Sequence, residues 1–341
     1  MNPERDLITA ITRRAAAFAP TSPPAGLRQG IGDDCAIWKP SPQQDSLITT
    51  DTLVEGVHFD RRWHPPHLLG RKAVAVNMSD IAAMGGTPRY VLLSLGLGDQ
   101  EDPAWLDAML DGLAEAVAAY GAVLIGGDTV NSPERLLLSV TVIGESPESR
   151  ACLRSSGQPG DSVWVGGPLG LAAGGLELCR QGLATDPRWQ PAVQAHLDPQ
   201  AQVELGQKLA TAGLVHAMMD LSDGLATDLA HICTASGVSA EVAAALLPIP
   251  ALVHRAAAVC QADPLSWALG GGEDYHLLFT ADPAHDPAIS NLAGTVAGAT
   301  LTRIGCLTAP PAGGPGVILR DADGTGREIS YRGYDHFRAA P

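Results

Sequence analysis

The sequence predicts an α/β (α+β) protein of two domains, and three observations support this. Its 341 residues exceed the length at which one hydrophobic core stops growing, so two domains of roughly 150 residues are expected. Aromatic residues make up only 4%, while aliphatic residues and glycine are abundant, which suits packed helices and buried strands. Apolar runs typical of helices and of strands alternate along the chain.

Predicted helices and strands alternate in the N-terminal half. Helices are expected over 4–18, 68–84 and 102–120, and Asp102-Pro103 marks the start of the last. Strands are expected over 47–50, 91–97, 122–125 and 136–143. The segment 144–161 is rich in Gly, Pro and Ser and has no apolar period, so we predict a boundary near Glu148. The two domains are then 1–148 and 149–341.

The C-terminal half has the same character. Strands are expected over 162–165, near Glu241 and over 276–280. Helices are expected over 169–181, 200–212 and 225–236. Near the end, the stretches 317–319 and 328–331 flank Asp323-Gly324 as the strands of a hairpin would. This half is therefore also predicted to be α/β.

The charge balance and the cysteines exclude several classes of protein. The chain has 37 acidic and 22 basic residues, a formal net charge of −15, without any Lys/Arg run, so nucleic acid is not an expected partner. The six cysteines lie far apart without a CxxC spacing, which indicates thiols in a reducing compartment. Charges interrupt the N-terminal residues, and no apolar run reaches about 18 residues. A cytoplasmic protein without a membrane partner is expected.

Aspartates recur in short segments that also contain Gly, Ser or Thr. These segments are Gly30-Ile31-Gly32-Asp33-Asp34, Thr49-Thr50-Asp51, Asn77-Met78-Ser79-Asp80, Gly126-Gly127-Asp128-Thr129, Asp220-Leu221-Ser222-Asp223-Gly224 and, as a related case, Gly270-Gly271-Gly272-Glu273-Asp274. We expect them to be loops at the ends of strands or helices, where α/β proteins build their sites. Their convergence on one cleft is therefore predicted.

The chemistry of this set indicates magnesium and phosphate. Carboxylates and hydroxyls are hard oxygen ligands that suit Mg²⁺, which commonly bridges a few carboxylates to substrate phosphates. Clustered acids repel a triphosphate unless metal ions neutralise the charge and align the reacting oxygens. Neighbouring glycines let backbone N–H groups approach phosphate oxygens. The set predicts Mg²⁺-dependent phosphoryl transfer from ATP.

Each segment alone also has an ordinary structural explanation. Asp beside Gly is common in turns, and Asp ahead of a helix is a common N-cap, as Asp223 would be before Leu225. Oxygen-rich segments also suit structural Ca²⁺ in a non-enzymatic binding protein. Ca²⁺ loops draw most ligands from one continuous segment, whereas these acids are spread over much of the chain, so the enzyme is favoured.

Other motifs are weaker. The sequence contains no GxxxxGK[ST], HExxH or GxSxG. The stretch 166–170 precedes a predicted helix, where it either cradles phosphate or simply starts the helix. Arg154 and Lys72 either pair with phosphates or lie solvated on the surface. His58 and His231 are either metal ligands or proton carriers, or ordinary structural histidines.

Eight stretches, in this order and spacing, carry a resemblance to a known family. They are GIGDDCA (30–36), TTDTLVEGVHF (49–59), KAVAVNMSDIAAMGG (72–86), GGDT (126–129), RSSGQPGD (154–161), DLSDG (220–224), GGGEDY (270–275) and GYDHF (333–337). Over nearly its whole length the chain resembles thiamine-monophosphate kinases, within the aminoimidazole ribonucleotide synthetase superfamily.

The resemblance implies a fold and a reaction. The fold is the two-domain aminoimidazole ribonucleotide synthetase-like one, whose N-terminal domain, which binds ATP and Mg²⁺, pairs through its β-sheet in a homodimer. The C-terminal domain completes the nucleotide and substrate sites. The reaction is ATP-dependent phosphorylation of thiamine monophosphate to thiamine diphosphate by direct in-line transfer, the last step of thiamine diphosphate biosynthesis. The nearest rival is another ATP-using member, such as aminoimidazole ribonucleotide synthetase, which shares the acidic segments but needs a different acceptor pocket.

The resemblance also implies residue roles, without any covalent nucleophile or obligatory base. Several Mg²⁺ ions are held by Asp34, Thr49, Thr50, Asp51, Asp80, Asp128, Asp220 and Asp223. ATP is contacted by Gly127, Asp128, Arg154 and Ser222. Thiamine monophosphate is held by His58, Glu273 and Tyr331, and the tyrosine is expected to stack on an aromatic ring of the substrate.

Overall fold

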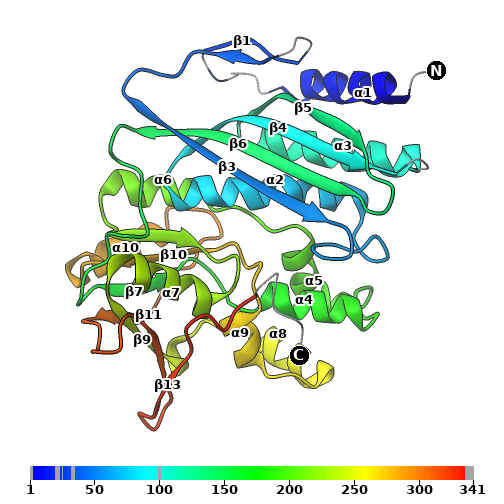
Figure 1. Cartoon of the computed structure of the whole chain (residues 1–341). Helices are drawn as coiled ribbons and strands as arrows, with labels where there is room; N and C mark the ends of the chain where they lie inside the picture. Colours follow the sequence, from blue (N-terminus) through cyan, green and yellow to red (C-terminus); the bar gives the residue numbers. More distant parts are fainter. Residues whose placement is uncertain (1–2, 20–23, 25, 32–34, 99–100, 335–341) are drawn as a thin grey trace. The chain divides into compact units, whose positions relative to one another are not determined.

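A computed structural model describes residues 3–19, 24, 26–31, 35–98 and 101–334. The chain divides into two compact units. Unit 1 comprises residues 1–81 and 86–150, and unit 2 comprises residues 82–85 and 151–341. Each unit has its own sheet (Figure 1).

The described part of unit 1 contains a four-stranded sheet with the order β3-β6-β4-β5. Its strands are β3 (Gln44–Val54), β4 (Thr87–Leu97), β5 (Val123–Asn131) and β6 (Leu137–Pro147). β6 pairs antiparallel with both β3 and β4, whereas β4 and β5 are parallel and are joined through a helix. The helices of this unit are α1 (Pro3–Ala17), α2 (Pro66–Ala83, which continues into unit 2) and α3 (Pro103–Ala119).

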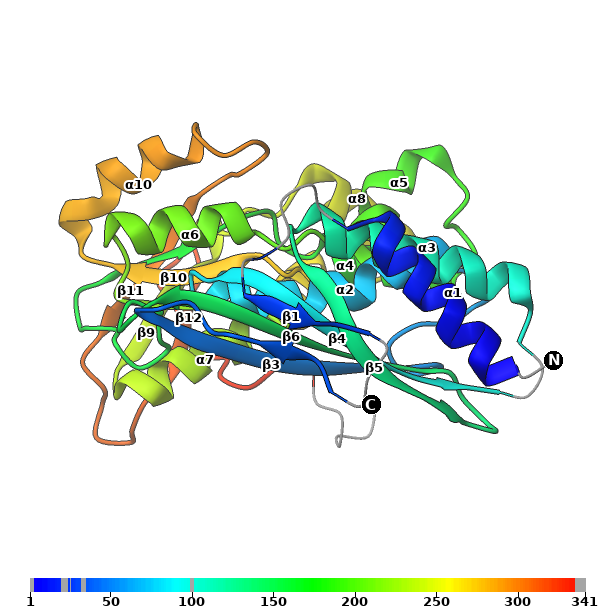
Figure 2. The same ribbon diagram turned by 90° about the horizontal axis from the view of Figure 1, so that it is seen from above.

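One face of the unit 1 sheet is covered by helices (Figure 2). α3 begins as the sequence predicted, because the Asp102 side chain caps it by accepting from the N–H of Ala104 at 3.0 Å. α2 and α3 approach at backbone distance: a Cβ on Gly70 would lie 2.0 Å from the Met109 carbonyl oxygen, and one on Gly112 would lie 1.9 Å from that of His67.

Within the described part of unit 1, no helix covers the opposite face of this sheet, which we call the open face. Near one end it is covered by a short hairpin of β1 (Leu27–Gln29) and β2 (Ile37–Trp38), where the rings of Trp38 and Tyr90 lie 6.0 Å apart. Farther along β3, Ile48 is 68% exposed. Exposed apolar and small polar residues therefore share this face.

The described part of unit 2 contains a seven-stranded sheet with the order β13-β12-β9-β11-β7-β10-β8. The strands are β7 (Ser162–Val165), β8 (Ala217–Asp220), β9 (Ser239–Ala243), β10 (Leu277–Ala281), β11 (Thr302–Thr308), β12 (Val317–Arg320) and β13 (Gly326–Glu328). Its helices are α4 (Leu171–Arg180), α5 (Gln190–Leu197), α6 (Val203–Ala212), α7 (Leu225–Ser236), α8 (Ala251–Cys260), α9 (Pro264–Gly270) and α10 (Asp286–Ala293).

The central strands of this sheet are buried on both faces. Val163 and Val165 belong to a core with α7 and α9, whereas Trp164 between them belongs to a second core with α6 and α10. Because successive side chains of a strand point to opposite faces, this arrangement explains why the central strands are continuously apolar. No helix in the described part of the chain is long and apolar enough to cross a membrane.

Most long elements predicted from the sequence are present. The predicted hairpin near the end is present as the antiparallel pair β12 and β13, but its second strand is Gly326–Glu328 and not 328–331. The sequence analysis missed β1, β2, β8, β11, α5 and α8–α10. β1, β2 and β8 have only two to four residues, so a strand period has few residues in which to show. The alternation of strands and helices also concealed that most strand pairs are antiparallel.

Candidate functional site

Three of the aspartate segments are not loops, which corrects the sequence analysis. Thr49-Thr50-Asp51 lies inside β3, Asn77–Asp80 lies inside α2, and Gly126–Thr129 lies inside β5. The sequence analysis expected loops here although its own strand over 47–50 and helix over 68–84 already reach into two of these segments, and the structure confirms the strand and the helix. In the structure, the carboxylates therefore project from rigid elements.

A first group of site residues lies between β3 and α2 in unit 1. Thr49 Oγ1 donates a 2.5 Å hydrogen bond to Asp80 Oδ2, and the backbone N–H of Asp51 donates at 2.9 Å to Asn77 Oδ1. Desolvation of the Asp51 carboxyl and, second, the neighbouring Asp80 carboxylate raise the pKa of Asp51 from 3.8 to about 6. The two carboxylates repel each other when both are ionised, so binding a cation between them would be favourable.

A second group lies on the open face of the sheet. Thr50 Oγ1 donates to the Val140 carbonyl at 3.2 Å and accepts from Thr141 Oγ1 at 3.0 Å, so its hydroxyl points away from Thr49 and Asp51. The pairing register aligns residues across the sheet in the strand order β3, β6, β4, β5. One row is Asp51, Val140, Leu93 and Gly127, and the next row is Thr52, Ser139, Ser94 and Asp128. Asp128 therefore shares the open face with Thr52.

The two groups do not meet within one sheet. β3 and β5 are its opposite edges, so Asp51 and Gly127 are separated by three strand spacings, about 14 Å. Gly127 is constrained by its neighbours: at φ 155°, a Cβ would lie 1.8 Å from the Leu93 carbonyl oxygen. The expected convergence on one cleft is thus not seen inside unit 1. Asp34, like Asp33, lies outside the described residues.

His58 lies in the turn after β3. The ring atom Nδ1 of His58 accepts a 3.0 Å hydrogen bond from the backbone N–H of Val54. The backbone N–H of His58 donates to the Val54 carbonyl at 2.9 Å. Because Nδ1 is an acceptor, the neutral imidazole carries its proton on Nε2. His58 can therefore donate to a substrate oxygen but cannot serve as a base through Nδ1.

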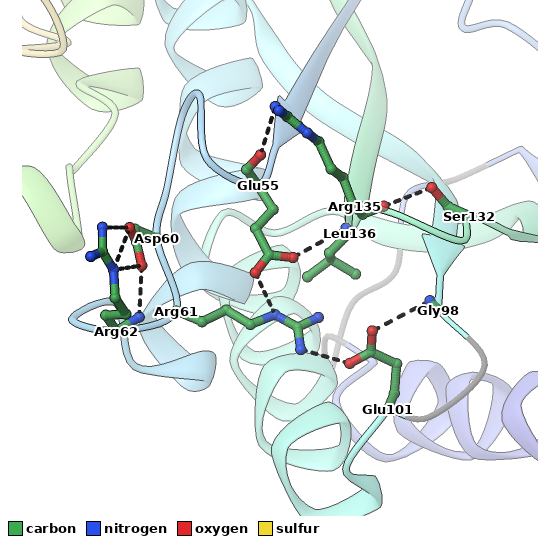
Figure 3. A network of polar contacts seen from close by, with 9 residues as sticks. All are labelled: Glu55, Asp60, Arg61, Arg62, Gly98, Glu101, Ser132, Arg135 and Leu136. Atoms are coloured by element: carbon green, nitrogen blue, oxygen red, sulfur yellow. Dashed lines mark hydrogen bonds and ion pairs between the residues drawn. The ribbon is translucent and has the colours of Figure 1, made fainter.

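A network of polar contacts fixes this turn against the ends of the sheet and α3 (Figure 3). Glu55 Oε2 accepts from the N–H of Leu136 at 3.2 Å, and Glu55 Oε1 lies 3.3 Å from Arg61 Nε. Arg61 Nη1 donates to Glu101 Oε2 at 2.7 Å, and its guanidinium lies 4.3 Å from the ring centre of Trp105. Arg61 is thus the link between the turn that carries His58 and α3.

In unit 2, two distant segments are joined by backbone hydrogen bonds into one structure. Leu221 and Ser222 follow β8 and accept from the N–H groups of Tyr275 and Glu273, each at 2.8 Å. Glu273 and Tyr275 have positive φ values of 60° and 49°, which the pairing requires. Ser222, Asp220 and Glu273 are therefore brought together, as predicted for a site, at one end of β8 and β10.

Asp223 does not cap α7, which corrects the structural explanation considered for it. Gly224 occupies the N-cap position at φ 108° and makes no side-chain cap. Instead, Asp228 Oδ2, one turn into α7, accepts from the N–H groups of Asp223 at 3.2 Å and Gly224 at 3.0 Å. The sequence analysis missed Asp228, although an acidic residue within the apolar run LATDLAHI was a usable signal.

Asp228 is fully buried, and its Oδ1 has no hydrogen-bond partner among the described residues. Burial first, and then the Asp220 and Asp223 carboxylates, raise its pKa well above 3.8. Such a buried carboxyl beside two acids is costly without a counter-charge. A positive charge bound at this end of β8 would offset that cost.

The end of the described chain packs against the same place. The N–H of Tyr334 donates to the Asp223 carbonyl at 3.0 Å, and the N–H of Gly333 donates to Thr227 Oγ1 at 2.8 Å. Tyr331 Oη and Thr234 Oγ1 lie 2.7 Å apart, and half of the tyrosine remains exposed. Tyr331 is therefore held next to the Asp223 segment.

His231 lies among three of the predicted site residues. Its ring meets that of Tyr331 edge-on at 5.4 Å. Burial, followed by the Arg154 charge, lowers the pKa of His231, whereas Asp223 opposes this shift. The carbonyl of Arg154 is itself fixed by a 2.8 Å hydrogen bond from Ser236 Oγ. Arg154, Asp223 and Tyr331 thus all act on His231.

The glycine stretch before α4 has a protein partner. Asp274 Oδ2 and Oδ1 accept from the N–H groups of Gly170 at 2.9 Å and Ala172 at 3.4 Å. The carboxylate occupies the helix N-terminus at which phosphate binding was considered. Lys72, the other phosphate candidate, is fully buried and is therefore not a surface side chain.

The donor set fits Mg²⁺. All the candidate ligands offer carboxylate or hydroxyl oxygen, and Mg²⁺ usually takes one or two protein carboxylates and leaves the other positions to phosphate and water. Among the described residues, no three His, Cys, Asp or Glu side chains form a metal cage by themselves. The paired acids at Asp51 and Asp80, and the unpartnered oxygen of Asp228, are consistent with ions held jointly with a phosphate ligand.

Comparison with known proteins defines the class first. Residues 32–146 match the family model "AIR synthase related protein, N-terminal domain", and residues 158–315 match "AIR synthase related protein, C-terminal domain". Thiamine-monophosphate kinase of Bacillus subtilis (strain 168) is 35% identical over 340 residues, covering 98% of this chain and 99% of the relative. The chain belongs to the thiamine-monophosphate kinase family.

Solved structures agree with this assignment. Thiamine-monophosphate kinase from Stenotrophomonas maltophilia K279a is 36% identical, with a TM-score of 0.81, and the match covers 93% of this chain and 97% of that one. A structure described as AaThiL complexed with AMPPCP and TMP is 32% identical, with a TM-score of 0.73 and coverage of 85% and 89%. The predicted aminoimidazole ribonucleotide synthetase-like fold is therefore confirmed.

Proposed function

We propose that this chain is a kinase that transfers the γ-phosphoryl group of ATP to thiamine monophosphate and forms thiamine diphosphate. The observation that carries the proposal is the match to thiamine-monophosphate kinases over almost the whole of both chains. A structure of one such relative is described as a complex with an ATP analogue and TMP. The acidic segments of this chain supply the chemistry that such a transfer needs.

The acceptor is a phosphate that is already ionised near neutral pH, so the enzyme does not need a strong general base. Catalysis then depends on holding the acceptor oxygen in line with the γ-phosphorus and on neutralising charge. His58 suits a donor role, because its Nδ1 is occupied by the N–H of Val54 and its proton is on Nε2. Glu273 and Tyr331 hold the remainder of the acceptor in this proposal.

Mg²⁺ would neutralise phosphate charge and bridge phosphate oxygens to the protein. In unit 1 the residues that would hold it are Thr49, Asp51 and Asp80 beside α2, with Thr50 and Asp128 on the open face. In unit 2 they are Asp220 and Asp223. Rigid elements carry most of these groups, so little reorganisation is required when the ions bind. Gly127, Asp128, Arg154 and Ser222 contact the nucleotide.

The proposal includes a homodimer in the cytoplasm, without nucleic-acid or membrane partners. Ile48 and Val130 leave 68% and 53% of their surface exposed on β3 and β5 of the unit 1 sheet, and apolar exposure of this kind supports an interface there. The net charge of −15 supports the absence of a nucleic-acid partner.

A turnover assay tests donor, acceptor and metal together. Purified protein is incubated with Mg-ATP and thiamine monophosphate, and thiamine diphosphate and ADP are separated by chromatography. We expect equal amounts of the two products and no reaction in excess EDTA. Absence of thiamine diphosphate, with consumption of a different phosphate acceptor, would instead support another member of the superfamily.

Asp51→Asn tests the metal role. The substitution removes a charge while keeping the size of the side chain, so the fold should persist as judged by circular dichroism, and kcat should fall at least about 100-fold. Asp45→Asn, on the same strand, is the matched control and should retain activity. Unchanged turnover in Asp51→Asn would contradict the assignment and favour structural cations.

A further inference from the structure

A buried histidine contacts the predicted acceptor residue Glu273. His196 is on α5 and is 1% exposed, and its Nδ1 lies 2.8 Å from Glu273 Oε2. The Glu273 side chain is 24% exposed, so it contacts the buried histidine and is also accessible to solvent. Nothing in the sequence had marked His196, which comes from a helix that the sequence analysis missed.

The packing of α4 against α5 makes this contact possible. A Cβ added to Gly175 on α4 would lie 2.0 Å from the Ala192 carbonyl oxygen and 3.1 Å from the His196 Cβ. Only glycine at this position lets α5 come close enough. The close packing of the two helix backbones therefore fixes the position of His196.

The backbone of Glu273 is fixed from two other sides. Its N–H donates to the Ser222 carbonyl at 2.8 Å, and the next residue, Asp274, binds the N–H of Gly170 at 2.9 Å. A residue with φ 60° between two such anchors has little backbone freedom. The remaining freedom of Glu273 is the direction of its carboxylate, which His196 contacts.

We propose that His196 is a positioning residue for the acceptor, which orients the Glu273 carboxylate toward the organic part of the substrate. The proposal deepens and rests on the proposed kinase function. Because Nδ1 and Oε2 are only 2.8 Å apart, the imidazole limits the directions that the carboxylate can take. An oriented carboxylate loses less conformational entropy when a substrate binds, and this lowers KM for the acceptor.

The kinetic test separates acceptor binding from the rest of catalysis. His196→Phe keeps a planar ring of similar size but removes the nitrogen, and we expect KM for thiamine monophosphate to rise about tenfold. KM for ATP should change less than about threefold, since Glu273 is not a nucleotide residue in the proposal. His196→Asn restores a donor near the Nδ1 position and should recover most of the loss.

Val193→Ala is the matched control, because Val193 is a buried apolar residue one turn earlier on α5. It should lower stability without a selective effect on acceptor KM. If His196→Phe and Val193→Ala raise both KM values alike, the role of His196 is only structural and the proposal is wrong.

A double-mutant cycle tests whether His196 acts through Glu273. Glu273→Gln should weaken acceptor binding by itself, and adding His196→Phe should cause little further loss. Fully additive losses would overturn the proposal. Histidine side-chain ¹⁵N NMR needs no substitution at residue 196: Glu273→Gln should shift one imidazole Nδ1 signal, and an unchanged spectrum would count against the contact.

Failure of this inference is distinguishable from failure of the proposed function. If the wild-type protein forms thiamine diphosphate but the His196 variants keep wild-type KM values, only the positioning role is lost. If the wild-type protein forms no thiamine diphosphate, the kinase function is wrong, and the NMR result alone then reports on the pair.

Discussion

Asp274 illustrates how one carboxyl can link a site to the stability of the fold. It binds the N-terminus of α4 through Gly170 and Ala172, and it is adjacent to Glu273. Burial raises its pKa from 3.8 to about 7, although both backbone hydrogen bonds act in the opposite direction. Desolvation therefore dominates over hydrogen bonding at this residue.

The sign of the resulting pH dependence follows from the raised pKa. The folded state holds the proton more tightly than the unfolded state, so this stabilisation is complete below pH 3.8 and is lost as pH rises through 7. The loss amounts to about 2–4 kcal/mol. We expect the free energy of unfolding of the wild type to fall between pH 5 and 8 relative to that of Asp274→Asn, as measured by urea denaturation.

Comparison with the Asn variant is essential, because Asp51, with its pKa raised to about 6, contributes a change of the same sign. That contribution is common to both proteins and cancels in the difference. Parallel stability curves for the two proteins would show that Asp274 does not titrate in this range.

At the scale of elements, the helix pair α2 and α3 depends on two reciprocal glycines. Helix propensity alone predicts that Gly112→Ala stabilises α3 by up to about 1 kcal/mol. The structure predicts the opposite sign, because the new Cβ would lie 1.9 Å from the His67 carbonyl oxygen. Backbone overlap of this kind cannot be relieved by turning a side chain.

We therefore expect Gly112→Ala to destabilise the protein by about 2–4 kcal/mol, as measured by chemical denaturation. The control is the reverse substitution, Ala119→Gly, at the exposed end of α3. It should lower the free energy of unfolding by less than about 1 kcal/mol. A more stable Gly112→Ala variant would show that propensity outweighs packing here.

For the whole molecule, the open face of the unit 1 sheet is the surface to test for the proposed dimer. It carries Ile48 on one edge strand and Val130 on the other, together with threonines and serines of the central strands. An interface that uses this face would cover apolar groups which a single chain leaves in water.

Ile48→Asp places a charge in this predicted interface. We expect light scattering to give twice the chain mass for the wild type and a single chain mass for the variant, because an unpaired charge is costly to bury. Ile8→Asp on α1, also an exposed apolar residue, is the control and should remain dimeric. A monomeric wild type at micromolar concentration would refute the interface.

Local pattern was enough for many of the elements, and it supplied a hypothesis for the chemistry of the site. The runs 162–165 and 225–236 are the bounds of β7 and α7, because buried side chains repeat with the period of each element. The oxygen-rich segments likewise identified Mg²⁺ and phosphate as the candidate chemistry. Both inferences use residues that are neighbours in sequence.

The same reasoning failed where neighbours in sequence are separated in space. Thr50 and Asp51 are adjacent, yet the pleat of β3 sends the Thr50 hydroxyl toward Thr141 on the open face, while Asp51 belongs with α2 on the other. Sheet order, which local pattern does not encode, puts Asp128 on the far edge strand. The aspartate segments were therefore grouped by composition before their positions were known.

The sequence by itself determined that this is a two-domain α/β protein of the thiamine-monophosphate kinase family, and it supplied the hypothesis of oxygen ligands for metal and phosphate. Only the tertiary structure decided which of those ligands share a face, that Asp228 binds the N–H groups of Asp223 and Gly224, and that His196 contacts Glu273. The physical reason is the distance along the chain over which each effect acts. Hydrophobic period and composition describe residues within one element, whereas strand register, desolvation and contacts between helices depend on residues that are far apart in the sequence.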